Sequence, residues 1–194
     1  VCYQSGNKPV TMETAQKFVR MLLRSGHESV IEHSSLTVQF INVSRGFTHE
    51  LVRHRLTSPS QESTRYVDYA KEDKVDLDRF QLKFIVPPHK DEKENVKLEN
   101  GQLLSLEDMF TNIEMYYRGL RKAGFLAEDA RQILPIATKS EIVVTANFRE
   151  WRHVFSMRTQ KAAHWEIRST MVKLLQELQV LIPVIFDDFA PSGN

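Results

Sequence analysis

The amino-acid sequence predicts one mixed domain of the α+β class, with an antiparallel sheet, several long helices and no Rossmann arrangement. Three long stretches carry apolar residues at helical spacing. Two shorter stretches alternate apolar and polar side chains, which indicates half-buried strands. These elements follow one another irregularly, whereas a doubly wound fold requires regular alternation. We therefore expect a single domain over residues 1–194.

The first half of the chain predicts helices at 11–25 and 44–55 and strands at 36–43 and 80–86. The first helix begins after Thr11, a good N-cap residue, and ends before Gly26. Pro59 lies in a serine-rich stretch, so it ends the second helix and makes 56–62 a loop. A Pro-Pro pair at 87–88 closes the second strand.

The second half predicts helices at 105–123, 128–134, 148–158 and 163–181 and a strand at 142–144, after a polar segment at 89–102. Ser105 and Asp108 have the spacing of a capping box at the start of the first of these helices. The last helix carries a broad apolar stripe and ends before Pro183. This stripe is compatible with packing inside the domain or against another subunit.

The balance of charges limits the kinds of partner. The 26 lysines and arginines are matched by 25 acidic residues, for a formal charge of +1. The chain is therefore not a polyelectrolyte that coats nucleic acid or an anionic membrane, and any anion site must be local. Hydrophobic residues make up 41% of the chain, which is typical of a packed globular protein.

The cellular compartment is predicted from the cysteine count and from hydropathy. The one cysteine, Cys2, cannot form an intrachain disulfide or a cysteine-based metal site, and it favours a reducing compartment. No stretch approaches the roughly 20 apolar residues of a membrane span, and the start does not read as a signal peptide. We therefore expect a soluble, cytoplasmic protein.

A dense basic cluster is the main candidate for chemistry. Arg53-His54-Arg55 is followed seven residues later by Ser63-Thr64-Arg65-Tyr66. Arginines on both sides of a turn can converge on one anion, because guanidinium groups present paired donors that suit phosphate. The alternative interpretation is a solvated basic turn with capping serines.

The spacing of this cluster closely resembles the signature of the flavin-dependent thymidylate synthases. The segment 53–66 reads RHRLTSPSQESTRY. The resemblance extends to Gly26-His27-Glu28-Ser29 with Glu32-His33, to ARQILP at 130–135 and to NFREWRH at 147–153, ending at Arg158. These blocks occur in the order of the family.

The resemblance implies reductive methylation of dUMP to dTMP. It also implies 5,10-methylenetetrahydrofolate as the carbon donor, FAD as the hydride carrier, NADPH as the hydride source, and a homotetramer with active sites at subunit interfaces. The sequence has no G-x-G-x-x-G and no Walker A motif. A flavin dinucleotide must then be held without a Rossmann glycine turn, and arginine side chains are the available substitute.

The resemblance also assigns residues by matching positions. The positions expected to bind FAD are Ser29, Arg53, His54, Arg55, Gln61, Asn147, Phe148, Arg149 and His153. The positions expected to bind dUMP are Glu50, Leu51, Val52, Arg53, Gln61, Glu62, Ser63, Thr64, Arg65, Arg131 and Arg158. Arg158 matches the arginine that stabilises uracil ionised at N3, which directs electron density toward the C5 carbon to be methylated.

Two positions depart from the family pattern. Glu50 stands where some members have Gln, and a carboxylate beside a dianionic phosphate is repulsive unless an arginine neutralises it. Ala162 stands where some relatives have histidine, so one flavin contact is either missing or moved to His164. Cys2 lies outside every matched block, which favours the role of a small buried hydrophobe over that of a nucleophile.

Two other classes of function remain as alternatives. A metal hydrolase would use some of the seven histidines, but H-E-x-x-H is absent and the histidine spacings do not suit a helical metal pair, so we expect no metal. An RNA-binding module would place Arg45, Arg53, Arg55 and Arg65 on phosphates and stack bases on Tyr66 or Tyr69. Its surface is usually basic over a whole face, and the near-neutral charge argues against nucleic acid as a partner.

Overall fold

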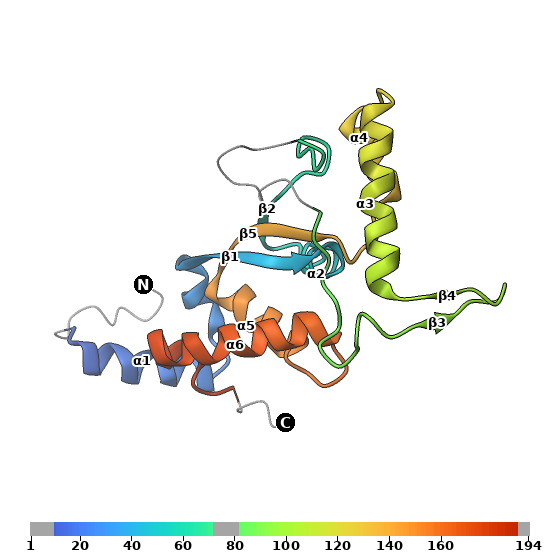
Figure 1. Ribbon diagram of the computed structural model, residues 1–194. Helices are drawn as coiled ribbons and strands as arrows, with labels where there is room; N and C mark the ends of the chain where they lie inside the picture. The colour runs from blue at the N-terminus through green and yellow to red at the C-terminus, as the bar shows by residue number, and fades with distance from the viewer. Residues whose placement is uncertain (1–9, 72–81, 190–194) are drawn as a thin grey trace. The chain divides into compact units, whose positions relative to one another are not determined.

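The computed structural model describes residues 10–71 and 82–189 (Figure 1). Its helices are α1 (Met12–Arg24), η2 (Glu28–His33), α2 (Arg45–Leu51), α3 (Leu106–Lys122), α4 (Ala127–Ala130), η3 (Arg131–Ile133), α5 (Phe148–Arg158), α6 (Trp165–Leu181) and α7 (Pro183–Phe186), of which η2 and η3 are 3₁₀ helices. Its strands are β1 (Ser35–Ser44), β2 (Ser58–Gln61), β3 (Val96–Lys97), β4 (Leu103–Leu104) and β5 (Lys139–Asn147).

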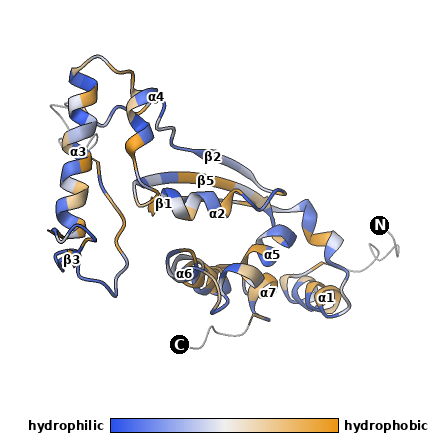
Figure 2. Ribbon diagram, turned by 90° about the vertical axis from the view of Figure 1, so that its right-hand side faces the viewer, coloured by the Kyte–Doolittle hydropathy of each residue, from blue (hydrophilic) through white to orange (hydrophobic). Residues whose placement is uncertain are grey.

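The main sheet has the strand order β1-β5-β2, which confirms the α+β class. Two backbone hydrogen bonds show that β1 and β5 run antiparallel: the amide of Phe148 donates to Ser34, and the amide of Arg45 donates to Thr138. Side chains on β5 are alternately buried and half-buried, and the strand is orange over part of its length in Figure 2. A separate antiparallel pair joins β3 to β4, with Val96 opposite Leu104.

Strand β1 contains an irregularity shortly before the following helix, α2. Phe40 and Val43 are buried, whereas the two residues between them are exposed. Asn42, one of those two, has a φ of 56°, in the left-handed region that Asn tolerates better than most residues. The alternation predicted for Leu36 to Phe40 therefore does not continue through 41–43, and the burial pattern is shifted by one residue, as in a β-bulge.

The contacts within the chain define two compact units, and each has its own core. One unit falls within Val1–Thr37 and Thr145–Asn194, and the other within Val38–Val144. In the first unit, the ring of Phe155 contacts those of Trp151 and Phe186, and the Trp151 indole donates to the Leu36 carbonyl at 3.0 Å. The single-domain interpretation of residues 1–194 stays a prediction.

The core of the second unit is an aromatic cluster. Tyr69, Leu82, Tyr117 and Ala130 are buried together. Tyr69 and Tyr117 meet edge to face, with their ring centroids 5.9 Å apart. The cluster packs helix α3 against the segment that follows β2, and α4 and η3 pack against the same helix.

The predicted helix ends are confirmed where side chains cap them. Thr11 accepts a hydrogen bond from the amide of Thr14 in a capping box at the start of α1. Ser105 and Asp108 form a second capping box at the start of α3. Helix α5 spans the predicted 148–158, and α6 ends at Leu181, two residues before Pro183.

Three predicted elements need correction. Helix α2 ends at Leu51 instead of continuing to 55, and the predicted loop 56–62 contains strand β2. The predicted strand at 80–86 is reduced, within its described part, to a single bridge between Phe84 and Thr138. Pro59 is compatible with β2 because that strand lies at the edge of the sheet.

Within residues 10–71 and 82–189, no helix is both long enough and apolar enough to cross a membrane.

The capping box of α3 gives a first prediction. Ser105→Ala removes the side chain that accepts from the Asp108 amide at 3.0 Å, so it should lower the free energy of unfolding by about 1 kcal/mol. Urea unfolding followed by circular dichroism measures the change. Thr111→Ala on the same helix is the control, because its hydroxyl only bonds the Glu107 carbonyl within the helix and its loss should not destabilise. Equal unfolding midpoints for Ser105→Ala and the parent would contradict the prediction.

Candidate active site

The basic tripeptide, Arg53-His54-Arg55, follows the end of α2 instead of lying on the helix. The amides of Arg53 and His54 donate to Glu50 and Leu51 in the turn that ends α2. His54 is 5% exposed, whereas Arg53 and Arg55 on either side of it are exposed. The His54 carbonyl accepts from the Thr57 hydroxyl at 2.7 Å. A buried histidine thus anchors a turn that presents two guanidinium groups to solvent.

A second turn carries the other signature residues. The Ser63 hydroxyl accepts from the Arg65 amide at 3.3 Å, and the Ser63 carbonyl accepts from the Tyr66 amide at 3.0 Å. The Arg65 guanidinium lies over the Tyr66 ring and pairs with the Glu128 carboxylate at 2.5 Å. Ser63 therefore shapes the turn, and Arg65 is held by a carboxylate on α4.

Two residues expected to bind dUMP meet at a cavity of about 250 Å³ in the second unit. Arg131 donates from Nη1 to the Thr64 hydroxyl at 3.4 Å and from Nε to the Glu128 carbonyl at 3.1 Å. The residues that line the cavity are Arg45, His49, Thr64, Arg131, Gln132, Leu134, Pro135 and Ile136. One part of the wall is cationic and another is apolar, which suits a phosphorylated organic molecule.

The end of strand β2 is fixed by side-chain hydrogen bonds. Gln61 donates to the Thr48 hydroxyl of α2 at 2.6 Å. The Tyr69 hydroxyl donates to the Glu62 carboxylate at 2.7 Å. Burial raises the pKa of Tyr69 well above its ordinary value, and the neighbouring Glu62 carboxylate raises it further. The Glu62 side chain is therefore held inside the fold by a tyrosine that stays protonated.

The residues at the end of α2 that are expected to contact dUMP differ in exposure. Leu51 is fully buried, so any contact by Leu51 must come from its main chain. Val52 is 37% exposed and Glu50 is half-buried. The assignment of Glu50, Leu51 and Val52 to dUMP binding stays a prediction.

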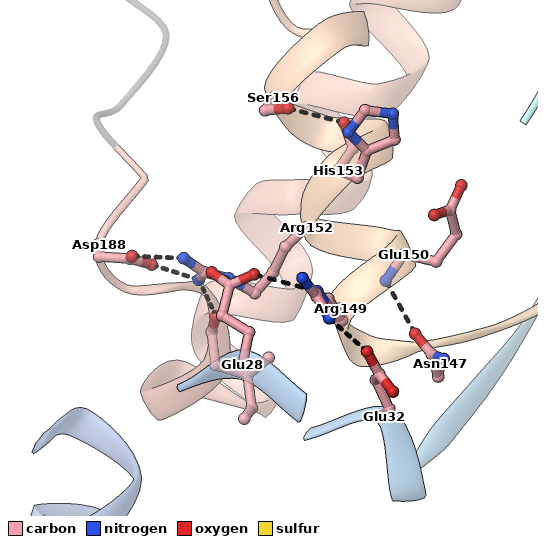
Figure 3. A network of polar contacts seen from close by, with 10 residues as sticks. Glu28, Glu32, Asn147, Arg149, Glu150, Arg152, His153, Ser156 and Asp188 are labelled. Carbon is pink, nitrogen blue, oxygen red and sulfur yellow. Dashed lines mark hydrogen bonds and ion pairs between the residues drawn. The ribbon is translucent and has the colours of Figure 1, made fainter. Parts of the chain in front are cut away.

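The remaining expected flavin positions lie in the first unit, on η2 and α5, which pack against each other. Ser29 is an exposed residue of η2. The Asn147 side chain caps α5 by accepting from the Glu150 amide at 2.9 Å. Arg149 pairs with the Glu32 carboxylate at 2.5 Å and with Glu28 at 3.6 Å (Figure 3).

One turn farther along α5, Arg152 extends the same network. It lies 3.7 Å from Glu28 and forms a two-pronged pair with Asp188, both hydrogen bonds being 2.6 Å long (Figure 3). Its guanidinium also donates to the Ile185 carbonyl and lies over the Phe189 ring. Arg152 therefore fastens the segment after α7 to α5. These hydrogen bonds lower the pKa of Asp188.

The remaining expected site residues of α5 do not take part in the Arg149 and Arg152 network. The Phe148 ring packs edge to face against Phe186, so it belongs to the core of this unit. His153 is exposed, and Arg158 is the half-buried last residue of the helix. His164, the suggested replacement for a contact at Ala162, is exposed and caps the start of α6 without a side-chain hydrogen bond to the helix.

The structure therefore groups the expected site residues within each unit. Thr64, Arg65 and Arg131 come together around α4 and η3 in the second unit. Ser29 lies on η2 and Arg149 on α5, which pack against each other in the first unit, and Asn147 caps α5. Cys2 lies outside the described residues.

Sequence reasoning missed the polar cavity residues Arg45, His49 and Gln132, and the apolar residues Leu134, Pro135 and Ile136, as members of the same site. Arg45 appeared only as one cation of the RNA-binding alternative. Its position directly after the Ser44 cap, at the start of a helix, was the available signal, because a cation there is not explained by helix stability. In the part of the chain that the structure describes, no cluster of His, Cys, Asp and Glu is arranged to hold a metal ion.

Comparison with known proteins identifies the family. The model of the family described as thymidylate synthase complementing protein matches residues 1–184. The flavin-dependent thymidylate synthase of Clostridium tetani is 36% identical over 197 residues, which cover 95% of this chain and 74% of that protein. The chain therefore belongs to the flavin-dependent thymidylate synthases.

Solved structures support the same fold. A crystal structure of thymidylate synthase X from Helicobacter pylori with FAD and dUMP matches with a TM-score of 0.70 and 20% identity, over 96% of this chain and 88% of that one. A UMP/dUMP methylase, PolB from Streptomyces cacaoi bound with 5-Br dUMP, matches with a TM-score of 0.69 and 24% identity, over 95% and 84% of the two chains. Both likenesses agree with the α+β architecture.

The pair of Arg152 and Asp188 predicts a pH-dependent contribution to stability. Because the folded-state pKa of Asp188 is lowered from 3.8, the contribution is present above the unfolded pKa and is lost as pH falls through the folded pKa. At pH 7, Asp188→Asn should therefore have a lower urea midpoint of unfolding than the parent. The difference between the two midpoints should shrink below about pH 4. Urea titrations at several pH values measure it. Glu177→Gln, an exposed carboxylate on α6, is the control. If the difference in urea midpoint stayed constant down to about pH 3, the ion pair would not be the cause of the difference in stability.

Proposed function

We propose that this protein catalyses the reductive methylation of dUMP to dTMP, with 5,10-methylenetetrahydrofolate as carbon donor and NADPH as reductant. The observation that supports this most is the cavity at which Thr64 and Arg131 meet. Both positions match dUMP-binding positions of the family that the sequence resembles. Membership of the flavin-dependent thymidylate synthases supports the reaction type.

The nucleotide phosphate would be bound by the cationic part of the cavity. Arg131 is already oriented by the Glu128 carbonyl and the Thr64 hydroxyl, so little conformational entropy is lost when it binds an anion. Arg65 lies next to this site and shares Glu128 with Arg131. A phosphate that binds Arg65 directly would replace the Glu128 carboxylate as its partner.

The residues of the basic tripeptide fit an FAD pyrophosphate. Two exposed arginines on a turn anchored by buried His54 provide the paired donors that a Rossmann fold supplies through backbone amides and a helix N-terminus. We propose that Arg53, Arg55 and Arg149, with Ser29, His54, Gln61, Asn147, Phe148 and His153, hold this cofactor. FAD supplies a carrier for the hydride that NADPH provides.

Arg158 would act on the pyrimidine instead of the phosphate. A guanidinium beside N3 favours the ionised ring and so makes C5 more nucleophilic. No enzyme thiol is required in this scheme, in agreement with the position of Cys2 outside every matched block. We further propose a cytoplasmic homotetramer whose active sites combine residues of different subunits.

The proposed cofactor role of the tripeptide predicts that Arg55→Ala binds FAD at least tenfold more weakly, because one charge-assisted pair is lost. Fluorescence titration of the flavin-free protein measures the affinity. Arg24→Ala, an exposed arginine at the end of α1, is the control and should bind FAD as the parent does. Parental affinity in Arg55→Ala would remove this residue from the cofactor site.

The role of Arg158 predicts a different kinetic signature from that of a phosphate-binding arginine. Arg158→Lys keeps the charge but loses the planar fork, so kcat for dTMP formation should fall while the KM for dUMP changes little. Arg65→Ala should mainly raise that KM, by about 10- to 100-fold. Steady-state assays of dTMP formation test both variants. Unchanged kcat in Arg158→Lys would reduce Arg158 to a binding residue, and a lack of dTMP formation by the parent would refute the proposed function.

A further inference from the structure

Glu28 lies between the guanidinium groups of Arg149 and Arg152 (Figure 3). One of its carboxylate oxygens is 3.6 Å from Nε of Arg149, and the other is 3.7 Å from Nε of Arg152. Both distances suit an ion pair, but both exceed the length of a hydrogen bond. The Glu28 carboxylate is therefore shared between two arginines and forms a hydrogen bond with neither Nε.

The two arginines differ in what else they contact. The Arg149 side chain is 52% exposed and pairs closely with Glu32, at 2.5 Å. The Arg152 side chain is only 11% exposed, and its two terminal nitrogens donate to Asp188. Its Nε is buried and has no hydrogen-bond acceptor among the residues that the structure describes. A buried donor without an acceptor costs stability, and the nearby Glu28 oxygen is a suitable acceptor for this one.

The present pairing of Arg149 is poorly suited to an anionic cofactor. Its guanidinium faces two carboxylates, those of Glu28 and Glu32. With Asp188, the network contains three carboxylates and only two guanidinium groups. The pyrophosphate of FAD is negatively charged, so this excess of negative charge opposes its binding. Arg149 becomes a better partner for the cofactor if one carboxylate moves away from it.

We propose that Arg152 is a positioning residue that draws Glu28 away from Arg149 when FAD binds. The proposal rests on the proposed role of Arg149 in holding the cofactor. Glu28 is the carboxylate that moves, because its contact with Arg149 is the longer of the two. A shift of about 1 Å brings its oxygen within hydrogen-bond distance of the Arg152 Nε. This shift satisfies the buried donor and leaves Arg149 with Glu32 as its carboxylate partner.

The test measures the FAD affinity of the flavin-free protein by fluorescence titration. Arg152→Lys keeps a cation opposite Asp188 but lacks Nε, so Glu28 stays with Arg149 and FAD should bind about two- to fivefold more weakly. Glu28→Gln removes the competing carboxylate and should tighten FAD binding by about the same factor. The double variant should bind FAD as Glu28→Gln does, because Arg152 acts through Glu28.

This rescue separates positioning from a merely structural role. If Arg152 only fastened the segment after α7, Glu28→Gln would not restore FAD binding in the double variant. Arg20→Lys is the matched control, because Arg20 holds the same segment through Asp187. It should bind FAD as the parent does. The thermal midpoint of each variant reports on folding.

Three results would overturn the role of Arg152. They are parental FAD affinity in Arg152→Lys, a loss of affinity that persists in the double variant, and FAD binding by Glu28→Gln that is no tighter than in the parent. The last of these decides the question if Arg152→Lys does not fold.

Arg149→Gln tests the proposed cofactor site separately. Parental FAD affinity in this variant would remove Arg149 from the cofactor site, and the role of Arg152 would fail with it. Weaker binding by Arg149→Gln, combined with parental binding by Arg152→Lys, would overturn the role of Arg152 alone.

Discussion

The fixation of arginine side chains by oxygen atoms of the protein is the interaction on which the candidate site depends. Arg131 and Arg45 are oriented by backbone carbonyls, whereas Arg65 is oriented by a carboxylate. Like charges that gather near an anion site repel one another when the anion is absent. Carbonyl and carboxylate acceptors offset that repulsion and keep the guanidinium planes in place.

The two kinds of acceptor have different consequences for binding. A carbonyl orients a guanidinium without neutralising it, so Arg45 and Arg131 keep their charge for a ligand. A carboxylate forms a complete ion pair, so an anion must compete with Glu128 for Arg65. The cavity between α2 and η3 is thus lined by two arginines that have backbone carbonyls as acceptors, and Arg65, whose partner is a carboxylate, does not line it. Glu128 provides both kinds of acceptor: its carbonyl accepts from Arg131, and its carboxylate accepts from Arg65.

Most helices could be predicted because their signals are local. The Ser105 and Asp108 capping box and the stop before Pro183 depend on residues a few positions apart, and both were found in the structure. Strand β2 could not be predicted, because Pro59 is tolerated only where the sheet has an edge, and that is a property of the whole sheet. The cavity was missed for a related reason. Arg45 and Arg131 are brought together by hydrogen bonds between distant segments, and the blocks that resemble the family contain only Arg131.

The shifted alternation at Asn42 constrains how the length of this segment can change. Successive residues of a strand point to opposite faces, so the removal of one residue reverses the side on which all later residues lie. Arg45 follows Asn42 by three residues, with the buried Val43 and Ser44 between them. An insertion or deletion of one residue here would therefore turn Arg45 away from its cavity and expose Val43 at the same time. Related sequences that keep this site should show a constant number of residues between the buried Phe40 and Arg45, even where the residue types differ.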